Sequence, residues 1–128
     1  MKTFFEFTST AFPDDAASED TVQEQVYGRR LAEFVATKLR AAGYNVADVY
    51  AEDWGWVVEL VNAEFPLWVG CIGFSADPTS FMCFIEPSRA FVQRWFQKLP
   101  TAGIVEPLAD TLEGILRAKA TEFVRREP

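Results

Sequence analysis

Residues 41–86 read AAGYNVADVYAEDWGWVVELVNAEFPLWVGCIGFSADPTSFMCFIE, and this stretch decides the fold. It contains four short apolar runs, at residues 45–51, 56–61, 67–74 and 81–86, which have the length and composition of β-strands. The breaks between them are too short for a parallel crossover, which takes a dozen residues or more. The stretch therefore predicts a chain of antiparallel hairpins.

The flanking sequence predicts one further strand and a first helix. Residues 2–9 alternate and are rich in Phe and Thr, which is typical of a strand, and residues 11–20 form a polar acidic loop. Thr21 and Glu24 fit a capping box at the start of a helix, and Gly43 fits its C-terminal stop. The apolar residues between them recur at helical spacing: Tyr27, Leu31, Phe34, Val35, Leu39 and Ala42.

Two more helices are expected after residue 86. Ser88 is the expected N-cap of the first, which ends at Pro100 and presents Phe91, Val92, Trp95, Phe96 and Leu99. A linker, residues 101–106, leads to Pro107 at the first position of the last helix. That helix presents Leu108, Leu112, Ile115, Leu116, Ala120 and Phe123, and residues 125–128 are expected to fray.

The predicted order is β-α-β-β-β-β-α-α, which is an α+β fold. We expect one domain over residues 1–128, with three helices on one face of a five-stranded, mostly antiparallel sheet, in two layers. Eight residues from the apolar stripes are expected in the core: Leu31, Phe34, Val58, Leu60, Val69, Phe84, Trp95 and Leu112.

Composition excludes several classes of function. The net charge of −7 and the pI of about 4.6 disfavour nucleic acid and anionic membrane surfaces as ligands. The sequence has no histidine, which removes the histidine-based catalytic triads and most zinc sites. It also has no nucleotide-binding glycine motif and no calcium loop. We therefore expect no enzyme activity, no metal and no cofactor.

The two cysteines, Cys71 and Cys83, lie in apolar runs outside any CxxC pattern. We interpret them as small buried hydrophobic residues in a reducing compartment, with a disulfide between neighbouring strands as the alternative. The N-terminus has no apolar segment of the kind a signal peptide needs. The expected location is the cytoplasm.

Charge is distributed unevenly, and this is the main functional signal. Residues 41–86 contain no lysine or arginine but seven carboxylates: Asp48, Glu52, Asp53, Glu59, Glu64, Asp77 and Glu86. They also hold three of the four tryptophans. Such a sheet favours a cationic partner. Lysine and arginine residues are concentrated instead in residues 87–128. One interpretation is that they form the ordinary solvated face of a helix. The other is that they neutralise an acidic surface, either in the same chain or in a homodimer.

The segment Glu52–Trp56 and the following Glu59 form the candidate partner-binding site. Trp54 and Trp56 flank a glycine at a predicted turn, so strand alternation directs one of them toward the core. One interpretation is that both tryptophans lie in the core or cover an edge of the sheet. The other is an exposed tryptophan beside Glu52 and Asp53, the composition of a hot spot for an arginine-bearing protein.

These features lead to two functional hypotheses. The first is a small acidic interaction protein of a bacterial kind, such as an immunity protein, inhibitor or adaptor, that docks on a basic protein. The second is a small-molecule-binding domain with an aromatic-lined pocket between sheet and helices. An enzyme that uses only carboxylates would need two acids converging in a cleft.

Overall fold

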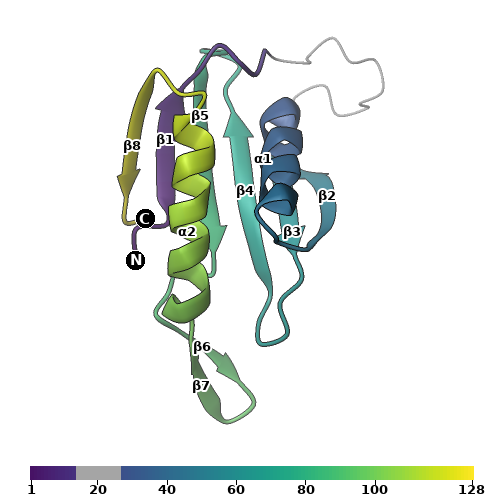
Figure 1. Cartoon of the computed structure of the whole chain (residues 1–128), viewed down its shortest axis with the longest axis vertical. Coiled ribbons are helices and arrows are strands. Elements are labelled where there is room, and N and C mark those ends of the chain that lie inside the picture. Colours follow the sequence, from purple (N-terminus) through teal and green to yellow (C-terminus); the bar gives the residue numbers. More distant parts are fainter. Residues whose placement is uncertain (14–26) are drawn as a thin grey trace.

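The computed structural model describes residues 1–13 and 27–128, and it confirms an α+β architecture with a mostly antiparallel sheet (Figure 1). Within these residues the chain forms two helices and eight strands. In chain order they are β1 (Phe4–Thr8), α1 (Arg29–Ala41), β2 (Val46–Glu52), β3 (Gly55–Leu60), β4 (Leu67–Gly73), β5 (Ser80–Glu86), β6 (Phe91–Arg94), β7 (Gln97–Pro100), α2 (Ala102–Arg117) and β8 (Glu122–Arg126).

Six of these strands form one sheet, in the order β2-β3-β4-β5-β1-β8, and every neighbouring pair is antiparallel. The strands predicted at residues 2–9, 45–51, 56–61, 67–74 and 81–86 are therefore present, with small differences at their ends. Both helices pack on the same side of the sheet, which makes two layers (Figure 1). We call the other side the open face.

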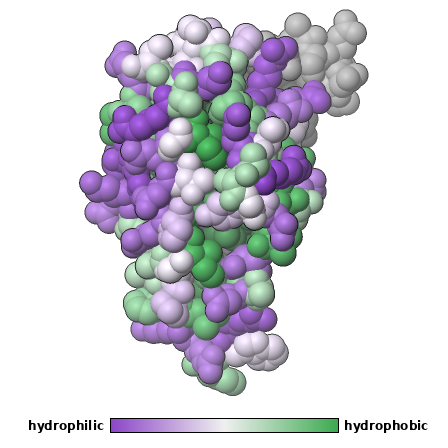
Figure 2. All heavy atoms as spheres, viewed as in Figure 1, coloured by the Kyte–Doolittle hydropathy of each residue, from purple (hydrophilic) through white to green (hydrophobic). Residues whose placement is uncertain are grey.

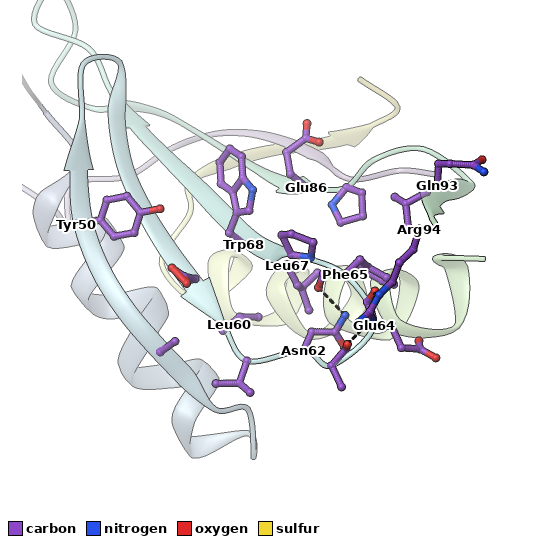
Figure 3. Close-up of a pocket in the computed structure, with 17 residues that line it drawn as sticks. Tyr50, Leu60, Asn62, Glu64, Phe65, Leu67, Trp68, Glu86, Gln93 and Arg94 are labelled. Carbon is purple, nitrogen blue, oxygen red and sulfur yellow. Dashed lines mark hydrogen bonds between the residues drawn. The ribbon is translucent and has the colours of Figure 1, made fainter. Parts of the chain in front are cut away.

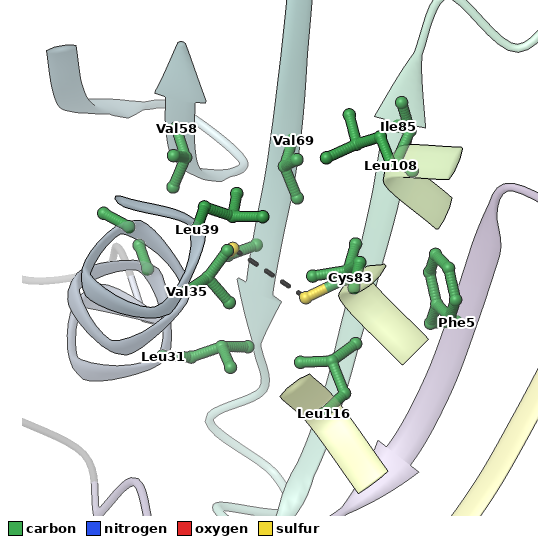
Figure 4. Packing of buried hydrophobic residues seen from close by; sticks show 14 of the residues in the cluster. Phe5, Leu31, Val35, Leu39, Val58, Val69, Cys83, Ile85, Leu108 and Leu116 are labelled. Atoms are coloured by element: carbon green, nitrogen blue, oxygen red, sulfur yellow. Dashed lines mark hydrogen bonds between the residues drawn. The ribbon is translucent and has the colours of Figure 1, made fainter. Parts of the chain in front are cut away.

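The core lies between the helices and the sheet (Figure 4). Five of the residues predicted to be in the core are buried there: Leu31, Val58, Leu60, Val69 and Leu112. Phe34 is only half-buried but packs against this core. Seen from the helix side, hydrophobic residues at the surface form separate patches among hydrophilic ones (Figure 2).

The helix predicted between Ser88 and Pro100 is wrong, because this segment forms the β6–β7 hairpin (Figure 1). Val92 pairs with Leu99, and both are half-buried, whereas Phe91 is exposed. Trp95 stands at the tip of the hairpin, so its predicted place in the core is also wrong. The apolar residues have helical spacing, but the two halves of the segment pair with each other as strands instead.

The last helix differs from prediction at both ends. It begins at Ala102, so the expected linker is helical and Pro107 lies inside the helix rather than at its first position. It ends at Arg117, and the expected frayed tail belongs to β8, which pairs with β1. Pairing with β8 satisfies the backbone groups that β1 would otherwise expose at the sheet edge.

The first helix ends as predicted. α1 stops at Ala41, and Gly43 has a φ of 98°, a conformation that glycine adopts without steric cost. Its described part begins at Arg29, after Gly28. The predicted capping box of Thr21 and Glu24, and most of the predicted loop at 11–20, lie outside the described residues.

Candidate functional site

Cross-strand register brings carboxylates together on the open face. Asp48 of β2 pairs with Glu59 of β3, Glu59 pairs with Trp68 of β4, and Trp68 pairs with Glu86 of β5. Residues directly opposite one another in an antiparallel sheet share a face. These four residues therefore form one row across four strands, which we call the acidic row.

Three aromatic side chains form a cluster beside the acidic row. The ring centroids of Trp54 and Trp68 are 5.8 Å apart. The ring centroid of Phe84 lies 5.4 Å from that of Trp54 and 5.5 Å from that of Trp68. Such distances are typical of favourable aromatic pairs. Trp54 comes from the β2–β3 turn and is 42% exposed. This aromatic cluster thus gives the open face an apolar centre that solvent reaches.

Gly70 makes the aromatic cluster possible. It pairs with Phe84 across strands β4 and β5, and a Cβ at position 70 would lie 2.3 Å from Phe84 Cζ. The Phe84 ring therefore lies against the glycine backbone. A glycine inside a strand often marks such a close approach to the backbone, and Gly70 is an example.

Desolvation and nearby acids both act on the hydroxyl of Tyr50. Tyr50 lies on the open face opposite Val57, and its pKa is raised above its usual value. Desolvation is the largest cause, followed by the charges of Glu59, Glu52 and Asp48. A phenolate at this point would meet the negative potential of three carboxylates. The same potential favours a cation placed beside Tyr50.

The structure separates the predicted site residues into two groups. Glu52, Trp54 and Glu59 belong to the open face, and exposed Asp53 lies in the adjoining turn. Trp56 lies on the opposite face, where it packs against the core and the Arg29 guanidinium approaches its ring at 5.8 Å. Of the two interpretations, the exposed tryptophan therefore holds for Trp54, and Trp56 is removed from the candidate surface.

A groove of about 920 Å³ continues the open face toward the β6–β7 hairpin (Figure 3). Its walls include Tyr50, Trp68 and three carboxylates, those of Glu59, Glu64 and Glu86. Arg94 of the hairpin donates hydrogen bonds to the carbonyl oxygens of Ala63 at 2.8 Å and Glu64 at 3.0 Å. These bonds tie the hairpin to the β3–β4 loop and define the end of the groove.

The hairpin tip carries the two most exposed aromatic side chains among the described residues. Trp95 is 84% exposed and Phe96 is 99% exposed. Trp95 has a φ of 57°, a left-handed conformation that is uncommon for a bulky residue and costs about 1–2 kcal/mol. The chain thus holds two large aromatic residues in water at the end of a projecting hairpin (Figure 1).

The cysteines form a buried pair rather than a reactive site. Cys71 and Cys83 face each other on β4 and β5, with their Sγ atoms 3.8 Å apart, and both are free thiols (Figure 4). Burial raises the pKa of the Cys83 thiol well above its usual value, which disfavours the thiolate that a nucleophile needs. The buried-residue interpretation is confirmed for both.

Among the described residues, no group of three or more acidic or cysteine side chains is placed to hold a metal ion. The open face can instead bind by charge and by aromatic contact. The predicted place of Phe84 in the core is wrong, because Phe84 is half-buried on the open face. The sequence pattern also does not assign Tyr50, Trp68 and Glu86 to this surface. Strand alternation alone assigns each to one side of its strand, but only the register across four strands shows that they are neighbours.

Comparison with protein-family profiles, with curated proteins and with solved structures finds no match to this chain. In the part of the chain that the structure describes, neither helix is both long enough and apolar enough to cross a membrane.

Proposed function

We propose that this chain is a non-catalytic interaction protein whose open face docks on a basic protein, in the manner of an immunity protein, inhibitor or adaptor. The observation that carries the proposal is the partly exposed aromatic cluster beside the acidic row. Strands β2 to β5 contribute no lysine or arginine that would neutralise these acids.

The expected ligand chemistry is an arginine-bearing segment. A guanidinium can pair with a carboxylate of the acidic row and stack on an aromatic ring at the same time, which an ammonium does less well. Trp54 supplies a large side chain at the centre of such a contact, and Glu59 and Glu86 supply charge on either side of Trp68. Charge steers the encounter, and the desolvated aromatic residue slows dissociation.

A titration with a short arginine-rich peptide tests the proposal. Glu59→Lys should weaken binding at low salt more than at high salt, because surface charges are screened over about 8–10 Å at 0.10–0.15 M ionic strength. Glu106→Lys on the exposed surface of α2 is the matched control, since it changes the net charge equally outside the open face. Equal effects of the two variants would place the binding surface elsewhere.

The contribution of Trp54 is tested by its rate constants. Trp54→Ala should raise the dissociation rate at least about fivefold, the effect of losing about 1 kcal/mol at a hot spot, with a smaller change in association. Phe74→Ala is the control, because Phe74 is similarly exposed, at 38%, and does not belong to the aromatic cluster. An unchanged dissociation rate in Trp54→Ala would remove Trp54 from the interface.

A second candidate function is binding of a small cationic aromatic molecule in the groove. The volume of about 920 Å³ and the presence of Tyr50 and Trp68 favour it. This groove lies on the open face and not between sheet and helices, where the core packs. Saturable binding of a small arylamine, competing with the peptide, would support this candidate.

A further inference from the structure

The β6–β7 hairpin has the chemistry that the open face would receive. Residues 87–100 contain three cations, Arg89, Arg94 and Lys98, and no acidic residue. All three cations are exposed, and Trp95 and Phe96 project between Arg94 and Lys98 at the tip. A basic, aromatic hairpin and an acidic, aromatic groove are therefore present on one chain.

We propose that two copies of this chain associate by exchanging hairpins, with the β6–β7 tip of each copy lying in the open-face groove of the other. The inference rests on the proposed function, and names a second copy as one occupant of the same surface. The tip does not lie in its own groove: Arg94, the last residue of β6, is hydrogen-bonded to the Ala63 and Glu64 carbonyls at one end of that groove. Trp95 and Phe96, which follow it, remain exposed to solvent. The tip projects away from the body of its own copy (Figure 1).

Size supports a reciprocal contact. A volume of about 920 Å³ lies within the roughly 300–1,000 Å³ of pockets that enclose ligands. A buried tryptophan or phenylalanine covers roughly 150–250 Å², so four of them cover on the order of 600–1,000 Å². With a comparable area on the receiving grooves, the total approaches the roughly 1,200–2,000 Å² of stable interfaces.

Symmetry and backbone conformation also favour exchange. A two-fold axis makes the two hairpin–groove contacts identical and closes the assembly at two copies. The left-handed conformation of Trp95 directs a bulky side chain outward at an energetic cost, and strained residues of this kind cluster where a surface binds. Burial of Trp95 and Phe96 in a second copy removes both from water, which offsets that cost.

Sedimentation velocity over a range of protein concentrations tests the exchange. Wild-type chain should shift from monomer to dimer, and the shift should move to higher concentration as salt rises. Trp95→Asn combined with Phe96→Ser should weaken association at least tenfold, and asparagine tolerates the left-handed conformation. Val124→Ser is the control, since Val124 is also exposed, at 55%, but lies in the β8 edge strand. A wild-type chain that stays monomeric, or a hairpin variant that dimerises normally, overturns the proposal.

Mixing two defective variants identifies the contact. A groove variant, Glu59→Lys with Glu86→Lys, and the hairpin variant should each be monomeric alone. Their mixture should form mixed dimers, because one intact hairpin still meets one intact groove. A mixture no more associated than its components contradicts hairpin exchange.

An arginine-rich peptide separates this inference from the proposed function. Titrated onto the hairpin variant, the peptide should bind the vacant open face, and in excess it should dissociate the wild-type dimer. Peptide binding to a chain that never dimerises overturns hairpin exchange and leaves the proposed function standing. A wild-type chain that dimerises, together with a hairpin variant whose vacant open face does not bind the peptide, overturns the arginine-binding function instead.

Discussion

At the scale of single residues, Gly70 determines how the open face is built. Its missing Cβ leaves the space that the Phe84 ring occupies, and Phe84 in turn contacts Trp54 and Trp68. One hydrogen in place of a methyl group therefore controls the position of the whole aromatic cluster. A conservative substitution there should affect both packing and the binding surface.

Gly70→Ala should destabilise the chain by about 1–3 kcal/mol, the usual cost of inserting a methyl group into a packed site. Displacement of Phe84 should also change the near-UV circular dichroism of the tryptophans. Gly114→Ala is the control, because a Cβ there meets nothing within 4 Å and lies in α2. It should stabilise the chain by about 0.5–1 kcal/mol, as expected for removing a glycine from a helix. Equal stability of the two variants in urea unfolding would contradict this account.

Glu113 joins the last two elements of the chain through charge. It accepts hydrogen bonds from Arg117 at 2.8 Å and Arg125 at 3.0 Å, which lower its pKa. The folded state therefore binds this proton less readily than the unfolded chain. The resulting stabilisation is complete above the unfolded pKa and is lost as pH falls through the lower, folded value.

Glu113→Gln should reduce the acid sensitivity of the fold. Between about pH 5 and about pH 3 the unfolding free energy of the wild type should fall more than that of the variant, because an unperturbed glutamate titrates near pH 4.3. Urea unfolding at several pH values measures this difference. If the unfolding free energies of wild type and variant change in parallel with pH, the ion pairs of Glu113 do not contribute to the acid sensitivity of the fold.

At the scale of elements, the β6–β7 hairpin shows how context overrides a periodic pattern. Phe91, Val92, Trp95, Phe96 and Leu99 have the spacing of a helix, but no described element covers such a stripe. Instead Val92 and Leu99 pack together across the hairpin, and the Thr101 amide donates to the Ala90 carbonyl at 3.0 Å. The turn residues Trp95 and Phe96 contain no glycine or asparagine, so the usual hairpin signal is absent.

Glycine substitutions should distinguish the two turn positions. Trp95→Gly removes the cost of the left-handed conformation and should slow amide hydrogen exchange in β6 and β7. Phe96→Gly, where no such conformation is present, should accelerate exchange because glycine only adds flexibility. Measurements below the dimerisation concentration isolate this local effect. Faster exchange in both variants would show that Trp95 is not strained.

At the scale of the whole molecule, the fold is an apolar layer between two helices and an antiparallel sheet. Its ends meet, because β1 and β8 are neighbours and the Met1 ammonium pairs with Glu127 at 3.0 Å. Arg126 pairs with Glu6 across the same two strands. Cys71 and Cys83 contribute to the layer as buried hydrophobic groups.

The chain should fold without a metal ion and without a disulfide. Because the core consists of apolar side chains from both layers, melting curves with and without chelator or reductant should overlay. Cys71→Ala should lower the stability because packing is lost, and the loss of stability should be equal under oxidising and reducing conditions. A fall of many degrees with either reagent would contradict this prediction.

The sequence by itself determined the antiparallel sheet of residues 41–86, most of the buried stripe and the absence of cations from strands β2–β5. These are local properties, because the alternation of apolar residues, the length of the breaks between strands and the charges of a segment can each be read from a few neighbouring residues. Only the tertiary structure decided that Trp54 is exposed while Trp56 is packed, and that residues 91–100 form a hairpin. It also placed Glu59, Trp68 and Glu86 in one row. Such placements depend on strand register and on which face the helices cover, and both arise from contacts between residues far apart in the chain.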